Sequence, residues 1–197
     1  RMIKGAARRI TLKIDPYKYQ HRAYKFYLDS IKFSHKSREG NQHMLQFKCA
    51  ASDAVFFLYL YLKSDAPIAI EMWVTKMRSD PMYQNMGYEF CTEIVTDEPG
   101  EWGMRSRQWA DVKSRLRTRV IYVTPETSKE AGTAENANKT AEHMIKAFLM
   151  QKNLPPDHWE ACARATEFVL ARHPKAIARH VTPGDGDMAR PLEIITN

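Results

Sequence analysis

Three consecutive stretches in the first half of the chain are dominated by apolar residues. Residues 23–33, 42–51 and 54–62 are rich in aromatic and β-branched residues, which favour strands. A polar segment containing Gly40 separates the first two stretches, as expected of a turn between strands. The pattern therefore predicts a three-stranded antiparallel meander.

The middle of the chain alternates between helical and strand periodicity. Residues 63–77 predict a helix with Ser64 or Asp65 as its cap, and residues 88–96 predict a fourth strand that contains Cys91. A basic helix over residues 106–117 and a fifth strand over residues 120–124 follow. The order of elements predicts an α/β fold around one mixed sheet.

The longest amphipathic segment comes next. Residues 124–132 have the polar composition of a surface loop, and Gly132 and Thr133 predict a sharp helix entry and an N-cap. Apolar residues then recur at helical spacing, at Ala137, Ala141, Met144, Ile145, Phe148 and Leu149. The opposite face carries Glu135, Asn138, Lys139, Glu142 and Lys146. Prolines 155 and 156 end this helix, and a last helix extends to His173-Pro174.

Composition predicts one domain with a polyanionic partner. A chain of 197 residues can bury one core, and a net charge of +7 with a pI near 9.3 suits nucleic acid. Residues 1–22 are predicted to be a basic arm or linker, residues 23–174 the core, and residues 175–197 a C-terminal extension. Since the chain begins with Arg1, we expect flanking domains of a polyprotein.

Cysteine and histidine usage excludes several classes of protein. Cys49, Cys91 and Cys162 are unpaired in spacing and fit reduced intracellular core positions, and no histidine lies at zinc-site spacing to them. The longest apolar run, residues 54–62, is far shorter than the ~20 residues that cross a membrane. We expect no membrane association and a nuclear or cytoplasmic location.

Two acids follow the predicted strands and helices in a suggestive order. Asp97 ends the fourth strand, Glu135 lies in the first turn of the long helix, and 37 residues lie between positions 97 and 135. This order resembles the second half of retroviral-type integrase cores. The segment Asp97-Glu-Pro-Gly-Glu-Trp102 stands where that family has Asp-Asn-Gly-Gly-Glu-Phe. Likewise, Glu135-Asn-Ala-Asn-Lys-Thr140 stands for Glu-Arg-x-Asn-Arg/Lys-Thr.

The resemblance is closest to copia-type retrotransposon integrases. It implies a ribonuclease-H-like mixed five-stranded sheet flanked by helices, with Asp29 on the first strand as the first acid; Asp53 or Asp15 are the alternatives. The segment Leu154-Pro-Pro-Asp-His-Trp159 also follows the family outline. Glu98 and Asn136 depart from it, since the family has Asn or Gly and then Arg at these positions.

The resemblance also implies a chemistry. Asp29, Asp97 and Glu135 would hold two Mg²⁺ or Mn²⁺ ions, because carboxylate oxygens suit hard cations and two ions can support an in-line phosphoryl displacement. The expected activity is 3′-end processing and DNA strand transfer by a homo-oligomer. DNA contacts are expected at Lys139, Asn138, Ser128 and Lys129. For Lys139 the alternative is an i,i+4 ion pair with Glu135.

Two other functions remain open from the sequence. One is a metal-dependent nuclease of the same fold, which would cut DNA without joining it. The other is a non-catalytic nucleic-acid-binding domain derived from a retroelement. Convergence of the three acids separates both enzymatic functions from the binding domain.

Overall fold

The computed structural model describes residues 23–81, 83, 89–96, 106–123, 128–172, 175–176 and 188–189. Within these ranges, the side chains of residues 128–135, 175–176 and 188–189 lie outside the description. The predicted N-terminal arm, residues 1–22, and most of the predicted C-terminal extension also lie outside the described residues.

A five-stranded mixed sheet forms the centre of the domain. Its strands are β1 (Lys25–Lys32), β2 (His43–Cys49), β3 (Val55–Leu60), β4 (Glu93–Thr96) and β5 (Arg119–Tyr122). They lie in the order β3-β2-β1-β4-β5. β1, β2 and β3 pair antiparallel, while β4 runs parallel to both β1 and β5. The prediction of a meander followed by two further strands in one mixed sheet is confirmed.

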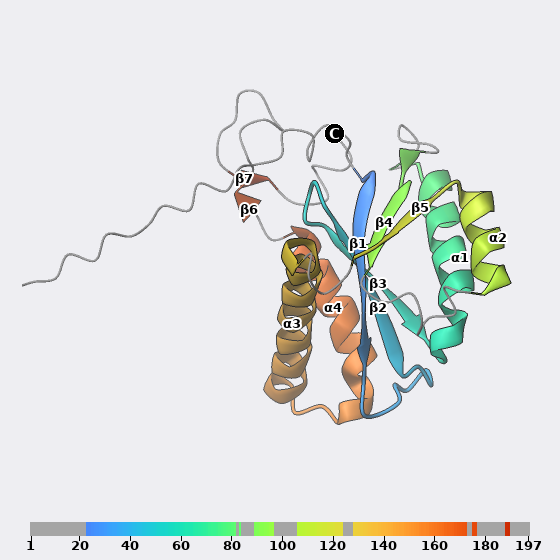
Figure 1. The fold of residues 1–197 in the computed structure, drawn as a ribbon. Helices are drawn as coiled ribbons and strands as arrows, with labels where there is room; N and C mark the ends of the chain where they lie inside the picture. Colours follow the sequence, from blue (N-terminus) through green and yellow to red (C-terminus); the bar gives the residue numbers. More distant parts are fainter. Residues whose placement is uncertain are drawn as a thin grey trace, which may run out of the picture.

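Helices cover both faces of this sheet (Figure 1). α1 (Ala66–Ser79) and α2 (Arg107–Leu116) lie on one face, and α3 (Ser128–Gln151) and α4 (Trp159–Arg172) lie on the other. Short 3₁₀ turns, η2 (Lys63–Asp65) and η4 (Pro156–His158), precede α1 and α4, and β6 (Lys175–Ala176) pairs antiparallel with β7 (Met188–Ala189). Among the described residues, no helix is long and apolar enough to cross a membrane.

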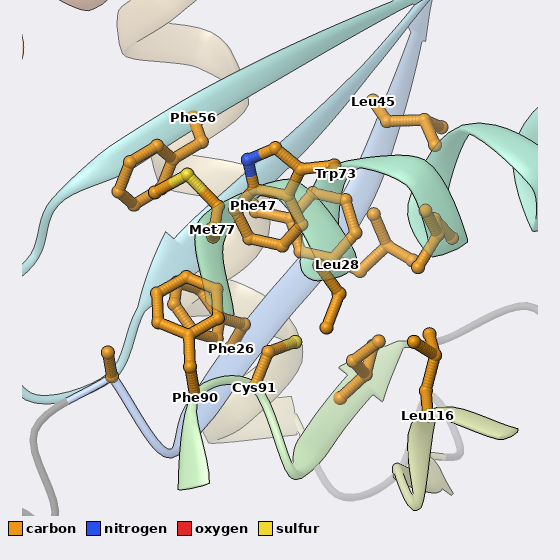
Figure 2. Close-up of a cluster of buried hydrophobic side chains, with 14 of the residues drawn as sticks. Phe26, Leu28, Leu45, Phe47, Phe56, Trp73, Met77, Phe90, Cys91 and Leu116 are labelled. Carbon is orange, nitrogen blue, oxygen red and sulfur yellow. The ribbon is translucent and has the colours of Figure 1, made fainter. Parts of the chain in front are cut away.

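The core beneath α1 and α2 is rich in aromatic residues (Figure 2). Trp73 of α1 lies 4.5 Å from Phe47 and 5.6 Å from Phe26, measured between ring centroids. These contacts fix α1 against the centre of the sheet, because aromatic pairs add packing energy to the area that they bury.

A second core lies beneath α3 and α4. Ile31 and Met44 of the sheet pack with Ala141 and Ile145 of α3 and with Trp159 of α4. Successive strand residues face opposite sides of a sheet, so Tyr27, Asp29 and Ile31 share the face that α3 and α4 cover. Asp29 is therefore a half-buried polar position between two apolar residues on the central strand.

The N-terminal end of α4 is tied to the turn between β1 and β2. The Trp159 indole N–H donates to the carbonyl of His35 at 3.0 Å, and Phe33 stacks on the Trp159 ring at 3.8 Å. Glu160, which is 1 % exposed, accepts hydrogen bonds from Ser37 and Asn41 at 2.8 and 2.9 Å. These contacts fix the N-terminal end of α4 against the turn between β1 and β2.

Two sequence-based boundaries are wrong. The helix predicted to begin at Gly132 and Thr133 begins at Ser128, so the segment expected to be a loop forms the first turns of α3. Lys129, Glu130 and Ala131 favour helix, and one interior glycine costs only about 1 kcal/mol. The predicted fourth strand is also shorter, because Cys91 adopts a positive φ of 54° and turns the chain before Glu93.

Candidate metal and nucleic-acid site

The strands predicted to carry the first two acids are hydrogen-bonded neighbours. β1 and β4 run parallel, and Tyr27 is the partner of Val95 in their register. Asp29 lies two residues beyond Tyr27 on β1. Asp97 directly follows the last residue of β4 in the sequence and lies outside the described residues. The adjacency of these two strands is thus confirmed, and the position of the Asp97 side chain stays a prediction.

Asp29 is partly buried and accepts two short hydrogen bonds. Its Oδ1 accepts from the backbone N–H of Ser30 at 2.6 Å, and its Oδ2 accepts from the Nδ2 of Asn138 at 2.6 Å. Hydrogen bonds to a carboxylate at such distances are charge-assisted and stronger than neutral ones. The Asn138 bond joins positions 109 residues apart in sequence and fixes α3 to the centre of β1.

Asn138 is buried although it was predicted to contact DNA. It is 6 % exposed, and its Nδ2 also lies 3.4 Å from the carbonyl oxygen of Ser30. Its Oδ1 is buried and has no hydrogen-bond partner among the described residues. In this conformation the side chain therefore donates a hydrogen bond to the carboxylate of Asp29. Lys139, the next residue of α3, is exposed.

Gln46 is a second buried amide next to Asp29. The two residues are Cα partners across β1 and β2, so their side chains leave the same face of the sheet. Gln46 is 2 % exposed, and its Oε1 has no hydrogen-bond partner within the described part of the chain. An unsatisfied buried carbonyl costs about 1–3 kcal/mol, so its burial at this position needs a reason.

The donor atoms around Asp29 fit a hard cation. Among the described side chains there is no group of three or more His, Cys, Asp or Glu residues that would hold a metal ion. Of the three predicted acids, only Asp29 has a described side chain. The described donors around it are oxygens, namely its carboxylate and the amide oxygens of Gln46 and Asn138. Such a set suits Mg²⁺ or Mn²⁺ and does not suit the softer zinc.

The remaining predicted residues fall in two groups. Glu135, Ser128 and Lys129 belong to α3, and their side chains lie outside the described ones. Asp53, an alternative to Asp29, lies in the turn between β2 and β3 and pairs with Lys48 at 2.9 Å. Because Asp53 is paired with Lys48 and β1 separates β2 from β4, the structure does not support Asp53 as the first acid. Asp15 lies outside the described residues.

A hollow of about 640 Å³ lies elsewhere, at the edge strand β3 between α1 and α4. Its lining includes Tyr59, Met72, Trp73 and Glu167, and neither Asp29 nor Asn138. Burial raises the pKa of Glu167 to about 7, although a backbone hydrogen bond from Phe57 opposes the shift. This hollow is separate from the candidate metal site.

Sequence reasoning missed that Gln46 pairs with Asp29 across the sheet and that Asn138 donates to its carboxylate. The signal for Gln46 was present, since an amide stands between Leu45 and Phe47 in an apolar strand. For Asn138 the signal was its place on the helix, three residues before Ala141 of the buried stripe. Neither pattern predicts that Asp29 is the neighbouring residue, because Asp29 belongs to a different secondary-structure element.

The fold is similar to that of solved retroviral integrase structures. The HTLV-2 integrase catalytic core domain in complex with magnesium (trimeric form) has a TM-score of 0.58 and 13% identity. The similarity covers 91% of this chain and 99% of that chain. The catalytic core domain of BIV integrase has a TM-score of 0.58 and 12% identity, with coverages of 88% and 93%.

A longer structure gives the same result. A chain of the simian T-cell lymphotropic virus intasome in complex with PP2A regulatory subunit B56 gamma has a TM-score of 0.59 and 13% identity. The similarity covers 86% of this chain and 58% of that chain, so the present chain spans less than two thirds of it. No family model and no curated protein sequence matches the chain.

These similarities define the class of fold. The mixed five-stranded sheet with two helices on each face is the ribonuclease-H-like fold of retroviral integrase catalytic cores. At 12–13% identity the similarity shows the fold alone. Activity, metal use and a retrotransposon origin are therefore proposals.

Proposed function

We propose that this chain is the catalytic core of a retrotransposon integrase of copia type, a metal-dependent polynucleotidyl transferase for 3′-end processing and DNA strand transfer. The observation that carries the proposal is the 2.6 Å hydrogen bond from Asn138 of α3 to Asp29 of β1. In the ribonuclease-H-like fold, this bond brings the helix that contains Glu135 to the strand that contains Asp29.

Strand register and helix geometry support the three proposed acids. Because Tyr27 pairs with Val95 in parallel strands, positions 29 and 97 are equivalent places two residues further along. Glu135 precedes Asn138 by three residues in α3, and positions separated by three share one helix face. Since Asn138 reaches Asp29, we infer that Glu135 lies on the helix face directed at the same site.

The proposed site needs cations, because three converging carboxylates repel one another. Asp29, Asp97 and Glu135 would hold two Mg²⁺ or Mn²⁺ ions, which supply Lewis-acid stabilisation of the phosphoryl oxygens and activate the attacking hydroxyl. Asn138 holds the Asp29 carboxylate in one orientation through its Nδ2. Lys139 is exposed one residue further on and is proposed to bind a DNA phosphate as a point charge.

The partners follow from charge and from the resemblance. A net charge of +7 favours DNA, with an affinity that falls as salt rises, by a slope of about 0.9 in log affinity against log salt for each phosphate neutralised. We further propose a homo-oligomer, a polyprotein context with flanking domains, and a nuclear or cytoplasmic location. Ser128 and Lys129, at the start of α3, are proposed to add DNA contacts.

The proposal is tested by strand joining on a short DNA duplex that carries the end sequence of the retrotransposon. Wild type, Asp29→Asn, Asp97→Asn and Glu135→Gln are compared in Mg²⁺ and in Mn²⁺, and Glu142→Gln is the matched control. Glu142 lies seven residues beyond Glu135 in α3 and pairs with Lys146 at 3.2 Å. We expect the three site variants to lose joining and hydrolysis, while Glu142→Gln retains both.

The same assay separates the competing functions. Metal-dependent cleavage without joining would assign a nuclease. DNA binding that neither needs nor responds to divalent metal, with no reaction in wild type, would assign a binding domain. Full activity in Asp29→Asn would contradict the proposed site, since a neutral amide would not replace a carboxylate that holds the ions.

A further inference from the structure

Gln46 combines three properties that packing alone does not explain. It is 2 % exposed, it is the cross-strand partner of Asp29, and its Oε1 has no hydrogen-bond partner among the described residues. Of the neighbours that share its face of the sheet, Met44 on the same strand and Phe57 on β3 are apolar, while Lys48 on the same strand pairs with Asp53 at 2.9 Å. A methionine at this position would fill the space without leaving a buried acceptor unsatisfied.

A second unsatisfied acceptor belongs to the amide that donates to Asp29. The Oδ1 of Asn138 is buried without a partner in the described part of the chain, while the Nδ2 of the same amide donates to Asp29. The described residues hold seven buried side-chain atoms without a hydrogen-bond partner, and two of them are these amide oxygens: one belongs to the cross-strand partner of Asp29 and the other to its hydrogen-bond donor. Buried polar atoms of this kind require an explanation.

A carboxylate can accept hydrogen bonds and hold a cation at the same time. A carboxylate offers about four lone-pair positions. Ser30 donates to Oδ1 of Asp29 and Asn138 donates to Oδ2. Mg²⁺ and Mn²⁺ sites that use few protein ligands retain several water molecules, and the protons of those waters need acceptors.

We propose that Gln46 is a positioning residue for the metal site: its Oε1 accepts a hydrogen bond from a water molecule of the hydrated ion held at Asp29. This inference rests on the proposed function. The Oδ1 of Asn138 supplies a second acceptor for the same hydration shell. Neither amide oxygen has a hydrogen-bond partner among the described residues, and binding of the hydrated ion offsets the cost of burying them. Loss of an outer-shell hydrogen bond typically weakens metal binding about 10–100-fold.

The test uses Gln46→Met, with titration calorimetry of Mn²⁺ as one measurement and the melting temperature in EDTA as the other. We expect Mn²⁺ to bind about 10–100-fold more weakly than to wild type. We also expect the variant to melt at or above the wild-type temperature in EDTA, because an unsatisfied acceptor has been removed. If the Gln46 amide has only a structural role, Gln46→Met should melt at a lower temperature than wild type and bind Mn²⁺ with unchanged affinity.

Two further variants keep the result interpretable. Gln42→Met makes the same change just before β2 and should bind Mn²⁺ as wild type does. Gln46→Glu retains an acceptor oxygen, so it should bind Mn²⁺ at least as tightly as wild type, and it provides the test if the methionine variant does not fold. Weak Mn²⁺ binding by Gln46→Glu would overturn the inference.

Failure of the inference is distinguishable from failure of the proposed function. If wild type binds Mn²⁺, Asp29→Asn abolishes binding and Gln46→Met binds like wild type, the metal site stands and the role of Gln46 is overturned. If wild type does not bind Mn²⁺, the proposed function falls and the role of Gln46 falls with it.

Discussion

The contact between Asn138 and Asp29 can be tested by replacing the donor with an acceptor. Asn138→Asp keeps the size and shape of the side chain, but it places a second carboxylate where Nδ2 lies 2.6 Å from Asp29 Oδ2. The variant loses an attractive bond and gains a repulsion at the same position. We therefore expect a large loss of stability in the metal-free protein at neutral pH.

The size of the loss follows from the geometry. A hydrogen bond to a charged group contributes about 1.5–3 kcal/mol. Two like charges ~4 Å apart repel by about 4 kcal/mol at an effective dielectric constant of 20. Asp29 is only partly buried, so solvent screens part of this repulsion. A loss of about 3–5 kcal/mol at pH 8 is expected.

The dependence on pH and metal gives the prediction its signature. Two adjacent carboxylates share a proton, which raises the pKa of one of them in the folded state. The folded variant then binds more protons than the unfolded chain, so its stability rises as pH falls from 8 toward 4 and is lost as pH rises. Mn²⁺ should also raise the melting temperature of the variant more than that of wild type, because the cation neutralises the pair.

The assay is thermal and urea unfolding in EDTA at pH 8 and pH 5, repeated with Mn²⁺. Asn136→Asp is the matched control, since Asn136 is exposed on the same helix and undergoes the same chemical change. If Asn138→Asp loses no more stability than Asn136→Asp at pH 8, the two side chains are not in contact, and the argument that α3 and β1 build one site is refuted.

Two further predictions concern acids of α4, each followed by urea unfolding against pH. Burial raises the pKa of Glu167 to about 7, so its ionisation above that pH lowers the stability of the folded wild type. The stability of Glu167→Gln relative to wild type should therefore increase by about 1–2 kcal/mol as pH rises from 5 to 8. The same stability difference at pH 5 and at pH 8 would contradict this. Glu160→Gln should lose about 2–4 kcal/mol at pH 7. Burial opposes its charge, but hydrogen bonds from Asn41, Arg164 and Ser37 hold the pKa below its ordinary value. The loss should shrink as pH falls below 4, and a loss independent of pH would argue against an ionised Glu160.

Periodicity along the chain was sufficient to predict the elements and the faces that they bury. The aromatic and β-branched run around Phe26 predicts a strand, and the stripe through Ala141 and Ile145 predicts the buried face of α3. These patterns can be recognised in the sequence because side-chain direction repeats every two residues in a strand and every 3.6 in a helix. The same logic predicted the mixed sheet, since the order of strands and helices restricts how they pack.

Helix and strand ends were less predictable. Gly132 and Thr133 form a reasonable local start signal, yet α3 begins at Ser128. Cys91 lies in a segment whose composition favours a strand, yet its positive φ turns the chain. At α3, helix-forming residues 129–131 offset the cost of about 1 kcal/mol for one interior glycine. At Cys91, the left-handed conformation costs about 1–2 kcal/mol, and full burial and the hydrogen bond from its N–H to the carbonyl of Ala23 offset this cost.

The site depended on information that no local pattern contains. A hydrophobic stripe shows that a face is covered, but it does not show which element covers it. Only the folded chain places β1 between β2 and β4, so that Gln46 becomes the neighbour of Asp29. Only the packing of α3 on that strand brings Asn138 to the same carboxylate. The sequence by itself determined the acids that suit a metal, whereas tertiary structure decided which buried amides surround Asp29, because contacts between residues far apart in sequence form only when the elements pack.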